Sequence, residues 1–480
     1  MSTAPHLQAF LADLERAGEL QRVRVPVNPV LEVTEVCDRV VRRSGPALLF
    51  EQPVGSSIPL VINVFGTERR MQMALGVGDI EEVAADIEDL LRLQPPRGLR
   101  EMLGALPKLD VLRKAAPTEV KRGACQEVTA EPDVGVLPIL QCWPDDAGRY
   151  ITYPLVFTKD PETGQRNVGT YRLQVVDGRT LLMHWQTHKG GAEHWRAHQR
   201  LGKPMEVAIV IGADPVTLYA GTAPLPDRMD ELMFAGFLRK QSVELVKCKT
   251  IDQEVPAEAE IVLEGVVQPG ELATEGPFGD HTGFYSMPEQ YPVFHLNTIT
   301  HRRNPVYHTI VVGPPPKEDY WLGYASVRIF LPMLKMQLPE IVDMHMPPEG
   351  IFNNLAVISI KKKYPGHAFK VMHALWGLGQ MMFTKMLIIV DDWVNVHDMQ
   401  EVIFVLGNHI DPARDVQIVK GPVDSLNHAA PLLDLGSKIG FDATAKWKSE
   451  GFDRPWPHYI KMSPAVQAKV DVLWGSLGLK

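Results

Sequence analysis

Short runs of β-branched residues recur between turn signals over residues 125–310, and this pattern constrains the fold more than any other feature of the chain. The turn signals are Asp160-Pro161-Glu162-Thr163-Gly164, Asp177-Gly178 and Val267-Gln268-Pro269-Gly270. Many short strands with this spacing are typical of a twisted sheet or a split barrel. We therefore predict a split β-barrel domain over residues 121–315, which ends at the Gly/Pro segment Gly313-Pro314-Pro315-Pro316.

Helix and strand patterns occur on both sides of this domain, so the predicted fold class is mixed α/β. The N-terminal α/β domain, residues 1–120, ends in a linker that contains Pro95-Pro96-Arg97-Gly98. Its first helix is predicted from an apolar face with Gly18 after the helix end: Leu7, Phe10, Leu11 and Leu14. In the C-terminal α/β domain, residues 316–480, the run from Met386 to Val390 before Asp391 is typical of a buried strand.

The chain ends in a predicted helix with Ser463 as its N-cap and Pro464 at its first position. Its apolar residues form one stripe: Val466, Val470, Leu473, Trp474 and Leu477. An apolar stripe on a helix packs against another surface. Either of two surfaces could cover this stripe: a neighbouring subunit or the core of the same chain.

Composition excludes several classes of protein. A formal net charge of −9, with no basic run longer than Lys361-Lys362-Lys363, argues against a general nucleic-acid binder. No segment reaches the roughly 18 consecutive apolar residues of a membrane-spanning helix. The 4 cysteines contain no CxxC pair, and the N-terminus lacks the layout of a signal peptide. We therefore expect a protein of the reducing cytoplasm.

Two carboxylates flank a Gly/Pro turn in the segment Glu275-Gly-Pro-Phe-Gly-Asp280. A turn of this kind can bring the two side chains together, and two close carboxylates resist joint ionisation. One of them would then hold a proton, while an arginine between them would keep the other charged. Arg172 is our candidate for that arginine. From spacing alone, the segment is also compatible with a charged surface turn.

Asp177-Gly178 predicts a tight hairpin between a strand that begins at Asn167 and a strand over residues 180–186. In that register the numbers of opposed residues add up to 355, which places Asn167 across from His188. Opposed side chains lie about 5 Å apart, close enough to share a cation such as Mn²⁺ or Mg²⁺. Asn167 and Arg172 would point to opposite faces of a regular strand, so we expect a bend near Gly169.

Lys189-Gly190-Gly191 follows at once and offers a cation and two open backbone amides to an anion such as a phosphate. Two HxxxH pairs, His184/His188 and His194/His198, give a rival zinc interpretation. It is weak because Gly190-Gly191 would break a single helix and neither pair contains the glutamate of HExxH. His194 and His198 are expected to face solvent from a helix.

These segments together resemble the UbiD family of decarboxylases along nearly the whole chain. The matching segments are LERAGEL, GPALLFE, CWPDDAG, NVGTYR, THKGG, PLPDRMDE, VKCKTIDQEVPAEAEIVLEG, EGPFGDHTG, LPEIVDMHMPPEG, DPARD and GSKIGFDAT. The resemblance is strongest to the 4-hydroxy-3-polyprenylbenzoate decarboxylase branch. It implies a split-barrel flavin domain between an N-terminal α/β domain and a C-terminal α/β oligomerisation domain, in dimers or hexamers.

The resemblance also implies prenylated FMN as cofactor, supplied by a flavin prenyltransferase, with Mn²⁺ and often K⁺ at its phosphate. The implied metal ligands are Asn167, His188 and Glu231. The implied cofactor contacts are Thr170, Tyr171, Arg172, His184, Trp185, Gln186, Lys189 and Gly190. The implied acid–base residues are Arg172, Glu275 and Asp280, with Asp280 as a protonated donor to carbon.

The chemistry that the resemblance implies is non-oxidative loss of CO₂ from an aromatic acid, with the flavin as the electron sink. The expected substrate is 4-hydroxy-3-polyprenylbenzoate of quinone biosynthesis, whose prenyl tail also suggests peripheral contact with a membrane. A menaquinone-pathway naphthoate or another aromatic acid is the alternative, because His184-Trp185-Gln186 and Lys189 stand where the family tends to have Arg-Trp-Leu and Arg. An FMN oxidoreductase and a non-catalytic carboxylase subunit are the alternatives from other classes.

Overall fold

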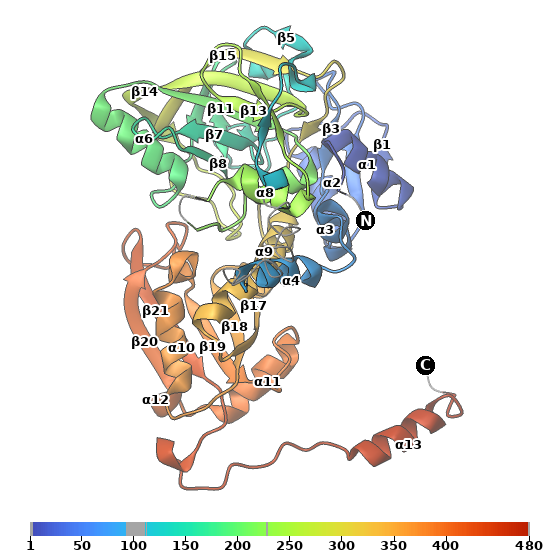
Figure 1. Cartoon of the computed structure of the whole chain (residues 1–480), viewed down its shortest axis with the longest axis vertical. Helices are drawn as coiled ribbons and strands as arrows, with labels where there is room; N and C mark the ends of the chain where they lie inside the picture. The colour runs from blue at the N-terminus through green and yellow to red at the C-terminus, as the bar shows by residue number, and fades with distance from the viewer. Residues whose placement is uncertain (1–2, 93–110, 112, 227–228, 479–480) are drawn as a thin grey trace, which may run out of the picture.

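The computed structural model describes residues 3–92, 111, 113–226 and 229–478. The predicted linker Pro95–Gly98 lies outside these residues. Figure 1 shows two main bodies, an upper one built on the N-terminal and central parts of the chain and a lower one built on its C-terminal part. No helix in the described part of the chain is both long and apolar enough to span a membrane.

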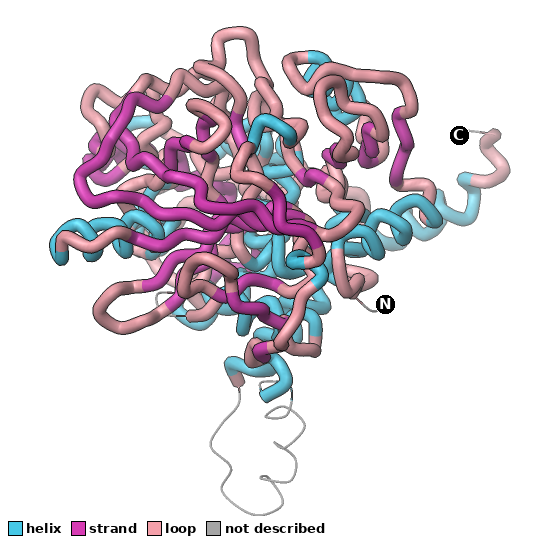
Figure 2. The backbone as a smooth tube through the Cα atoms, turned by 90° about the horizontal axis from the view of Figure 1, so that it is seen from above, coloured by secondary structure: helices cyan, strands magenta, loops and turns pink. Residues whose placement is uncertain are grey.

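The upper body contains a 9-stranded antiparallel sheet in the order β6-β9-β10-β15-β14-β11-β7-β8, with β5 paired to β15 (Figure 2). Its strands are β5 (Val128–Ala130), β6 (Tyr150–Ile151), β7 (Leu155–Lys159), β8 (Arg166–Thr170), β9 (Leu173–Val175), β10 (Thr180–Met183), β11 (Met205–Ile211), β14 (Ile261–Glu275) and β15 (Glu289–His301).

The sheet curls into a half-barrel, as the sequence predicted, and one short connection shows why it must. β8 is the strand at one edge of the sheet, and β9 is the second strand from the other edge. Only Tyr171 and Arg172 separate these two strands in the chain. Because two residues span less than about 10 Å, the two edges have to approach each other. Arg172 therefore lies where the barrel comes closest to closing.

Helices and a small sheet cover this half-barrel. The helices are α6 (Gly190–Leu201), α7 (Pro215–Ala220) and α8 (Glu231–Arg239). The small sheet has the order β13-β12-β4, from β4 (Thr118–Glu119), β12 (Glu244–Lys247) and β13 (Glu254–Pro256). α6 and α8 both contact β8, so the edge strand that leads to Arg172 is held from two sides.

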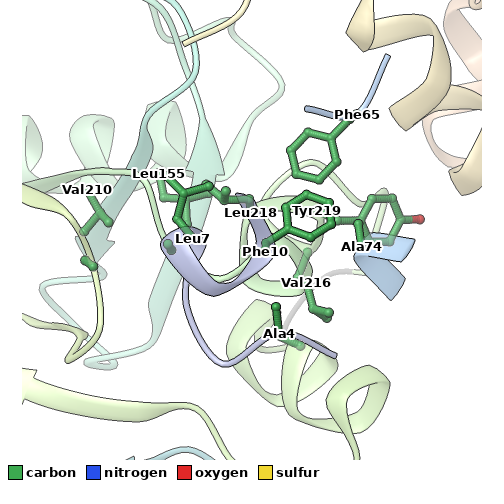
Figure 3. Packing of buried hydrophobic residues seen from close by; sticks show 14 of the residues in the cluster. Ala4, Leu7, Phe10, Phe65, Ala74, Leu155, Val210, Val216, Leu218 and Tyr219 are labelled. Atoms are coloured by element: carbon green, nitrogen blue, oxygen red, sulfur yellow. The ribbon is translucent and has the colours of Figure 1, made fainter. Parts of the chain in front are cut away.

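The N-terminal part forms a 4-stranded sheet in the order β1-β2-β3-β16. Its elements are α1 (Leu7–Arg16), β1 (Leu20–Val23), α2 (Glu32–Val41), β2 (Ala47–Phe50), β3 (Leu60–Ile62), α3 (Glu68–Leu75), α4 (Glu81–Leu91) and β16 (Tyr307–His308). The predicted face of α1 is buried, and its Phe10 packs near Phe65 and Tyr219 (Figure 3). Gly18 follows the helix with φ +73°, which favours glycine.

The lower body is an α/β unit with the strand order β17-β18-β19-β21-β20. Its elements are α9 (Glu318–Gln337), β17 (Ile341–His345), β18 (Leu355–Ile360), α10 (His367–Trp376), β19 (Met386–Asp391), α11 (Met399–His409), α12 (Pro412–Asp415), β20 (Val416–Pro422) and β21 (Leu435–Asp442). β19 is the buried strand that the sequence predicted, and it pairs in parallel with β18 and β21.

The last helix, α13 (Pro464–Trp474), begins at the predicted cap and projects away from both bodies (Figure 1). None of its residues is buried. Its stripe residues Val470 and Trp474 are 38% and 50% exposed. The helix thus does not pack on the described core of its own chain.

The predicted hairpin at Asp177-Gly178 is wrong by one residue. Leu181 pairs with Val175, and the Val176 amide donates to the Thr180 carbonyl at 3.0 Å, so opposed residue numbers add up to 356. Three residues, Asp177 to Arg179, therefore lie between the facing residues Val176 and Thr180, and within them the Asp177 carboxylate accepts the Arg179 amide at 2.8 Å. Asn167 belongs to β8 and pairs with Thr158 of β7, so it does not face His188 across a hairpin. The bend lies at Tyr171–Arg172, just after Gly169.

Candidate functional site

Arg172 lies between two buried carboxylates, Glu275 and Asp280. These three residues form the first part of the site, the acid–base clamp. Arg172 donates from Nε to Glu275 Oε1 at 2.8 Å and from Nη2 to Glu275 Oε2 at 3.1 Å. Its Nη1 donates to Asp280 Oδ2. Glu275 is fully buried at the end of β14, and Asp280 is 5% exposed. The structure therefore brings together the three residues that the Gly/Pro turn suggested, and excludes a solvated surface turn.

The turn is anchored by a residue that sequence reasoning did not select, Asp146. Its Oδ1 accepts the Gly279 amide at 2.7 Å, while Oδ2 accepts the amides of Cys142 and Trp143. A Cβ at Gly279 would lie 2.2 Å from the Trp143 ring, so only glycine fits there. Asp146 lies in the CWPDDAG segment, and its position next to EGPFGD could not be seen without the fold.

The charges of the site differ from the prediction of a protonated Asp280. Burial by itself would raise the pKa of the Asp280 carboxyl, but His281 and Arg172 outweigh it and hold that pKa well below its usual range. Burial would also raise the pKa of Glu275, but His184 and Arg172 lower it to about 2. Both carboxylates are therefore ionised, because each contacts a cation or a ring N–H that the sequence pattern did not reveal.

His184 belongs to this cluster rather than to a zinc site. Its Nδ1 lies 3.2 Å from Glu275 Oε2, and its ring packs on Tyr291 with a centroid distance of 4.3 Å. Burial and the charge of Arg172 lower the pKa of His184, so the ring is neutral and serves Glu275 as a hydrogen-bond donor.

The second part of the site lies at the N-terminus of α6. A Cβ at Gly190 would lie 2.1 Å from Asn167 Oδ1, so the amide of Asn167 occupies the space that a side chain there would fill. The Gly191 amide donates to the Tyr171 hydroxyl at 3.1 Å. Lys189 is the N-cap residue, and burial lowers the pKa of its ammonium. A helix N-terminus with a nearby lysine suits a phosphate group.

Two buried polar atoms here have no partner among the described residues, Thr170 Oγ1 and Trp185 Nε1. Buried polar atoms are usually hydrogen-bonded, so these two donors suit a polar ligand. Together with Lys189 and Gly190 they fit a flavin phosphate. Gln186 is partly buried beside Lys189 and accepts the Lys189 amide through its carbonyl.

Glu231 lies next to this phosphate site, since its Oε2 accepts the Val168 amide at 3.1 Å. Burial raises the pKa of Glu231 to about 7, because the described residues offer its carboxylate no ion pair. His188 is exposed in the turn before α6. No group of three or more His, Cys, Asp or Glu side chains in the described chain could hold a metal, and the predicted set has only two beside Asn167. The donors Asn167 and Glu231 nevertheless suit Mn²⁺ or Mg²⁺ completed by a phosphate.

The other two histidines of the zinc interpretation, His194 and His198, hold a helix against the sheet. His194 is buried in α6, contrary to the expectation that it faces solvent, and its Nδ1 lies 2.9 Å from Thr158 Oγ1. His198 Nε2 lies 3.3 Å from the Lys159 carbonyl. Both rings fix α6 against β7, because Thr158 and Lys159, the residues that they contact, belong to that strand.

The two parts of the site are joined by two short segments. Thr170 lies two residues before Arg172, and the His184 amide donates to the Arg172 carbonyl at 3.2 Å. The segments that follow β8 and β10 therefore run side by side from the phosphate site to the clamp. The phosphate site and the acid–base clamp are thus ends of one site.

The sequence matches three models of the 3-octaprenyl-4-hydroxybenzoate carboxy-lyase family. The N-terminal domain matches residues 11–89, the Rift-related domain residues 118–315, and the C-terminal domain residues 320–443. An uncharacterised protein of Archaeoglobus fulgidus is 52% identical over 473 residues, which cover 98% of each chain.

Solved structures that resemble the fold include two enzymes with sequence identities of 31% and 26%. An evolved dimeric form of the UbiD-class enzyme HmfF from Pelotomaculum thermopropionicum, in complex with prenylated FMN, is 31% identical with a TM-score of 0.77. The match covers 96% of this chain and 98% of that one. Vanillic acid decarboxylase of Sedimentibacter hydroxybenzoicus in closed form is 26% identical with a TM-score of 0.86, and the match covers 100% of both chains.

Proposed function

Because the chain belongs to the UbiD family of decarboxylases, we propose that it removes CO₂ from an aromatic acid at the Arg172 clamp, with prenylated FMN as cofactor. The observation that carries the proposal is the pair of hydrogen-bonded contacts from Arg172 to Glu275 and Asp280. The clamp offers a guanidinium for a substrate carboxylate and a carboxylate that can carry a proton to carbon.

The flavin supplies the electron sink that loss of CO₂ from an aromatic ring needs. Arg172 binds and orients the substrate carboxylate, and Glu275 keeps the guanidinium fixed through two parallel hydrogen bonds. Asp280 takes up a proton during turnover and delivers it to the carbon that lost CO₂. Ser286, which accepts from Arg172 Nη2 at 3.2 Å, limits the rotation of the guanidinium.

The phosphate of the flavin would lie at the N-terminus of α6. Lys189, Gly190 and Thr170 would contact it, and Tyr171, His184, Trp185 and Gln186 would line the rest of the cofactor site. Asn167, Glu231 and His188 would hold Mn²⁺ beside the phosphate, and His188 would turn inward from its exposed position. K⁺ as a second cation and a flavin prenyltransferase as the supplier of the cofactor complete the proposal.

Glu231→Gln is expected to lower both the Mn²⁺ content and the flavin content of the purified protein at least tenfold. The change keeps the size of the side chain but removes the negative charge that a metal ligand needs. Metal analysis and the flavin absorbance measure the two contents. Glu193→Gln, an exposed change in the first turn of α6, is the matched control. Full retention of metal and flavin by Glu231→Gln would remove Glu231 from the site.

For the substrate we propose 4-hydroxy-3-polyprenylbenzoate first and a naphthoate of the menaquinone pathway second. The loop after Asp280 favours a substrate with an apolar tail, because its Phe284 and Met287 side chains are 58% and 78% exposed and could contact such a tail. A membrane surface could deliver such a substrate to this loop. Co-expression with a flavin prenyltransferase, followed by CO₂ measurement with both acids and with short-chain analogues, ranks the substrates.

We also propose that α13 docks on a second copy of the chain, because its apolar stripe is uncovered and a dimeric form of HmfF shares the fold. Deletion of residues 452–480 is expected to convert the oligomer to a monomer in light scattering. Serine substitution of Val466, Val470 and Leu473 should do the same. Substitution of Lys469 and Asp471 on the same helix should not. An unchanged mass after the deletion would contradict this role.

A further inference from the structure

His281, the residue directly after Asp280, is placed to exchange a proton with it. Its Nδ1 lies 2.8 Å from Asp280 Oδ1, and its backbone amide donates to the same oxygen at 2.7 Å. Asp280 Oδ2 accepts from Arg172 on the other side. Each oxygen of this carboxylate thus has its own partner, an imidazole on one side and a guanidinium on the other.

The negative charges of three carboxylates from three segments act on the His281 ring. Asp280 belongs to the turn itself, Asp319 to the first turn of α9, and Asp424 to the segment after β20 in the lower body. Burial alone would lower the pKa of His281, but the negative charges of Asp280, Asp319 and Asp424 outweigh it and raise that pKa to about 9. At neutral pH the proton therefore resides on His281 and not on Asp280.

The His281 ring also lies where it can take up a new proton from water. His281 packs on Phe352 of the lower body with a centroid distance of 5.5 Å, so it sits between the two bodies. Its side chain is 18% exposed, whereas that of Asp280 is 6% exposed. Water can reach the imidazole more easily than the carboxylate.

Resting on the proposed function, we propose that His281 supplies the proton that Asp280 passes to the substrate carbon. The Nδ1–H bond of the imidazolium breaks as an O–H bond forms on Asp280. The O–H bond then breaks as the new C–H bond forms at the carbon that lost CO₂. Neutral His281 takes the next proton from water, so one proton is consumed for each CO₂ released.

Arg172 makes the proton transfer from His281 to Asp280 depend on the binding of substrate. In the structure Asp280 contacts two cations, which makes it a weak base. When Arg172 binds the carboxylate of the substrate, part of its charge is neutralised by that carboxylate. Asp280 then attracts a proton more strongly, and of its donors the His281 imidazolium, with Nδ1 at 2.8 Å, is the one that gives up a proton most readily.

The first test needs no cofactor. In cofactor-free protein labelled with ¹⁵N-histidine, His281 is expected to titrate with a midpoint near 9, and the midpoint should fall in Asp319→Asn and fall further in Asp280→Asn. His295, paired with Glu271 on the surface at 2.7 Å, is the internal comparison. A His281 midpoint near the ordinary histidine value would overturn the proposal, whether or not the protein releases CO₂.

The second test uses the loaded enzyme. His281→Gln should lower kcat at pH 7 by about 10²-fold with flavin content and KM unchanged, as loss of a proton donor does. Added imidazole should restore part of the rate in His281→Ala. His295→Gln should behave as the wild type. Wild-type kcat in His281→Gln would overturn the proposal, and Asp319→Asn, which leaves the ring intact, should shift the high-pH fall of kcat to lower pH even if His281→Gln does not fold.

Discussion

Replacing Asp280 with asparagine is expected to stop CO₂ release while the flavin stays bound. Asparagine keeps the size of the side chain and a hydrogen bond to Arg172, but it cannot carry a proton to carbon. Loss of a positioned general acid lowers rates by about 10²–10⁴-fold. Asp280 contacts Arg172 and His281 and none of the proposed phosphate-site residues, so the flavin content should not change.

CO₂ release and flavin absorbance on the same preparation measure both halves of this expectation. Asp252→Asn, which changes a carboxylate in the same domain that is 81% exposed, is the control and should match the wild type. Normal turnover by Asp280→Asn would remove Asp280 from the chemistry. Loss of flavin together with activity would show instead that Asp280 helps to build the cofactor site.

Replacing Arg172 with methionine is expected to destabilise the protein by about 3–5 kcal/mol at neutral pH. The change leaves Glu275 and Asp280 buried and charged without their guanidinium. Activity should also be lost, because the substrate carboxylate loses its partner. Arg172→Lys keeps the charge but not the bidentate geometry, so it should lose less stability and most of the activity.

The loss of folding stability caused by Arg172→Met should become smaller as the pH falls. The pKa of Glu275 is lowered from 4.5 to about 2 in the folded protein, so the stability that this shift contributes is full above pH 4.5 and is lost as the pH falls towards 2. The difference between wild type and Arg172→Met in denaturant unfolding should shrink over that range. A difference that stays constant from pH 7 to pH 3 would mean that the clamp does not depend on charge.

Local patterns predicted the parts of the site that depend on few residues. The Gly/Pro turn of EGPFGD does bring Glu275 and Asp280 to one arginine, because the turn itself sets their separation. The buried strand β19 and the first helix were also predicted correctly, since hydrophobic runs and periodic faces report burial directly.

The rest depended on contacts between distant segments. The hairpin differs from the prediction because three residues, Asp177 to Arg179, separate the facing residues Val176 and Thr180. Asn167 lies at the α6 site because α6 packs against β8, the strand that contains it. The ionised state of Asp280 follows partly from His281, whose charge is maintained by Asp319 and Asp424 from other elements. Asp146 was missed for the same reason, since its partner Gly279 lies 133 residues away.

Turnover in D₂O tests the proton-transfer role of the Arg172 clamp most directly. Protein co-expressed with a flavin prenyltransferase would be given 4-hydroxy-3-polyprenylbenzoate and naphthoate acids, and both CO₂ and the product would be analysed by mass spectrometry. We predict CO₂ release with one deuterium at the carbon that lost it, and neither from protein lacking the cofactor. No CO₂ from any aromatic acid, or turnover that instead requires NAD(P)H to reduce the flavin, would contradict the assignment.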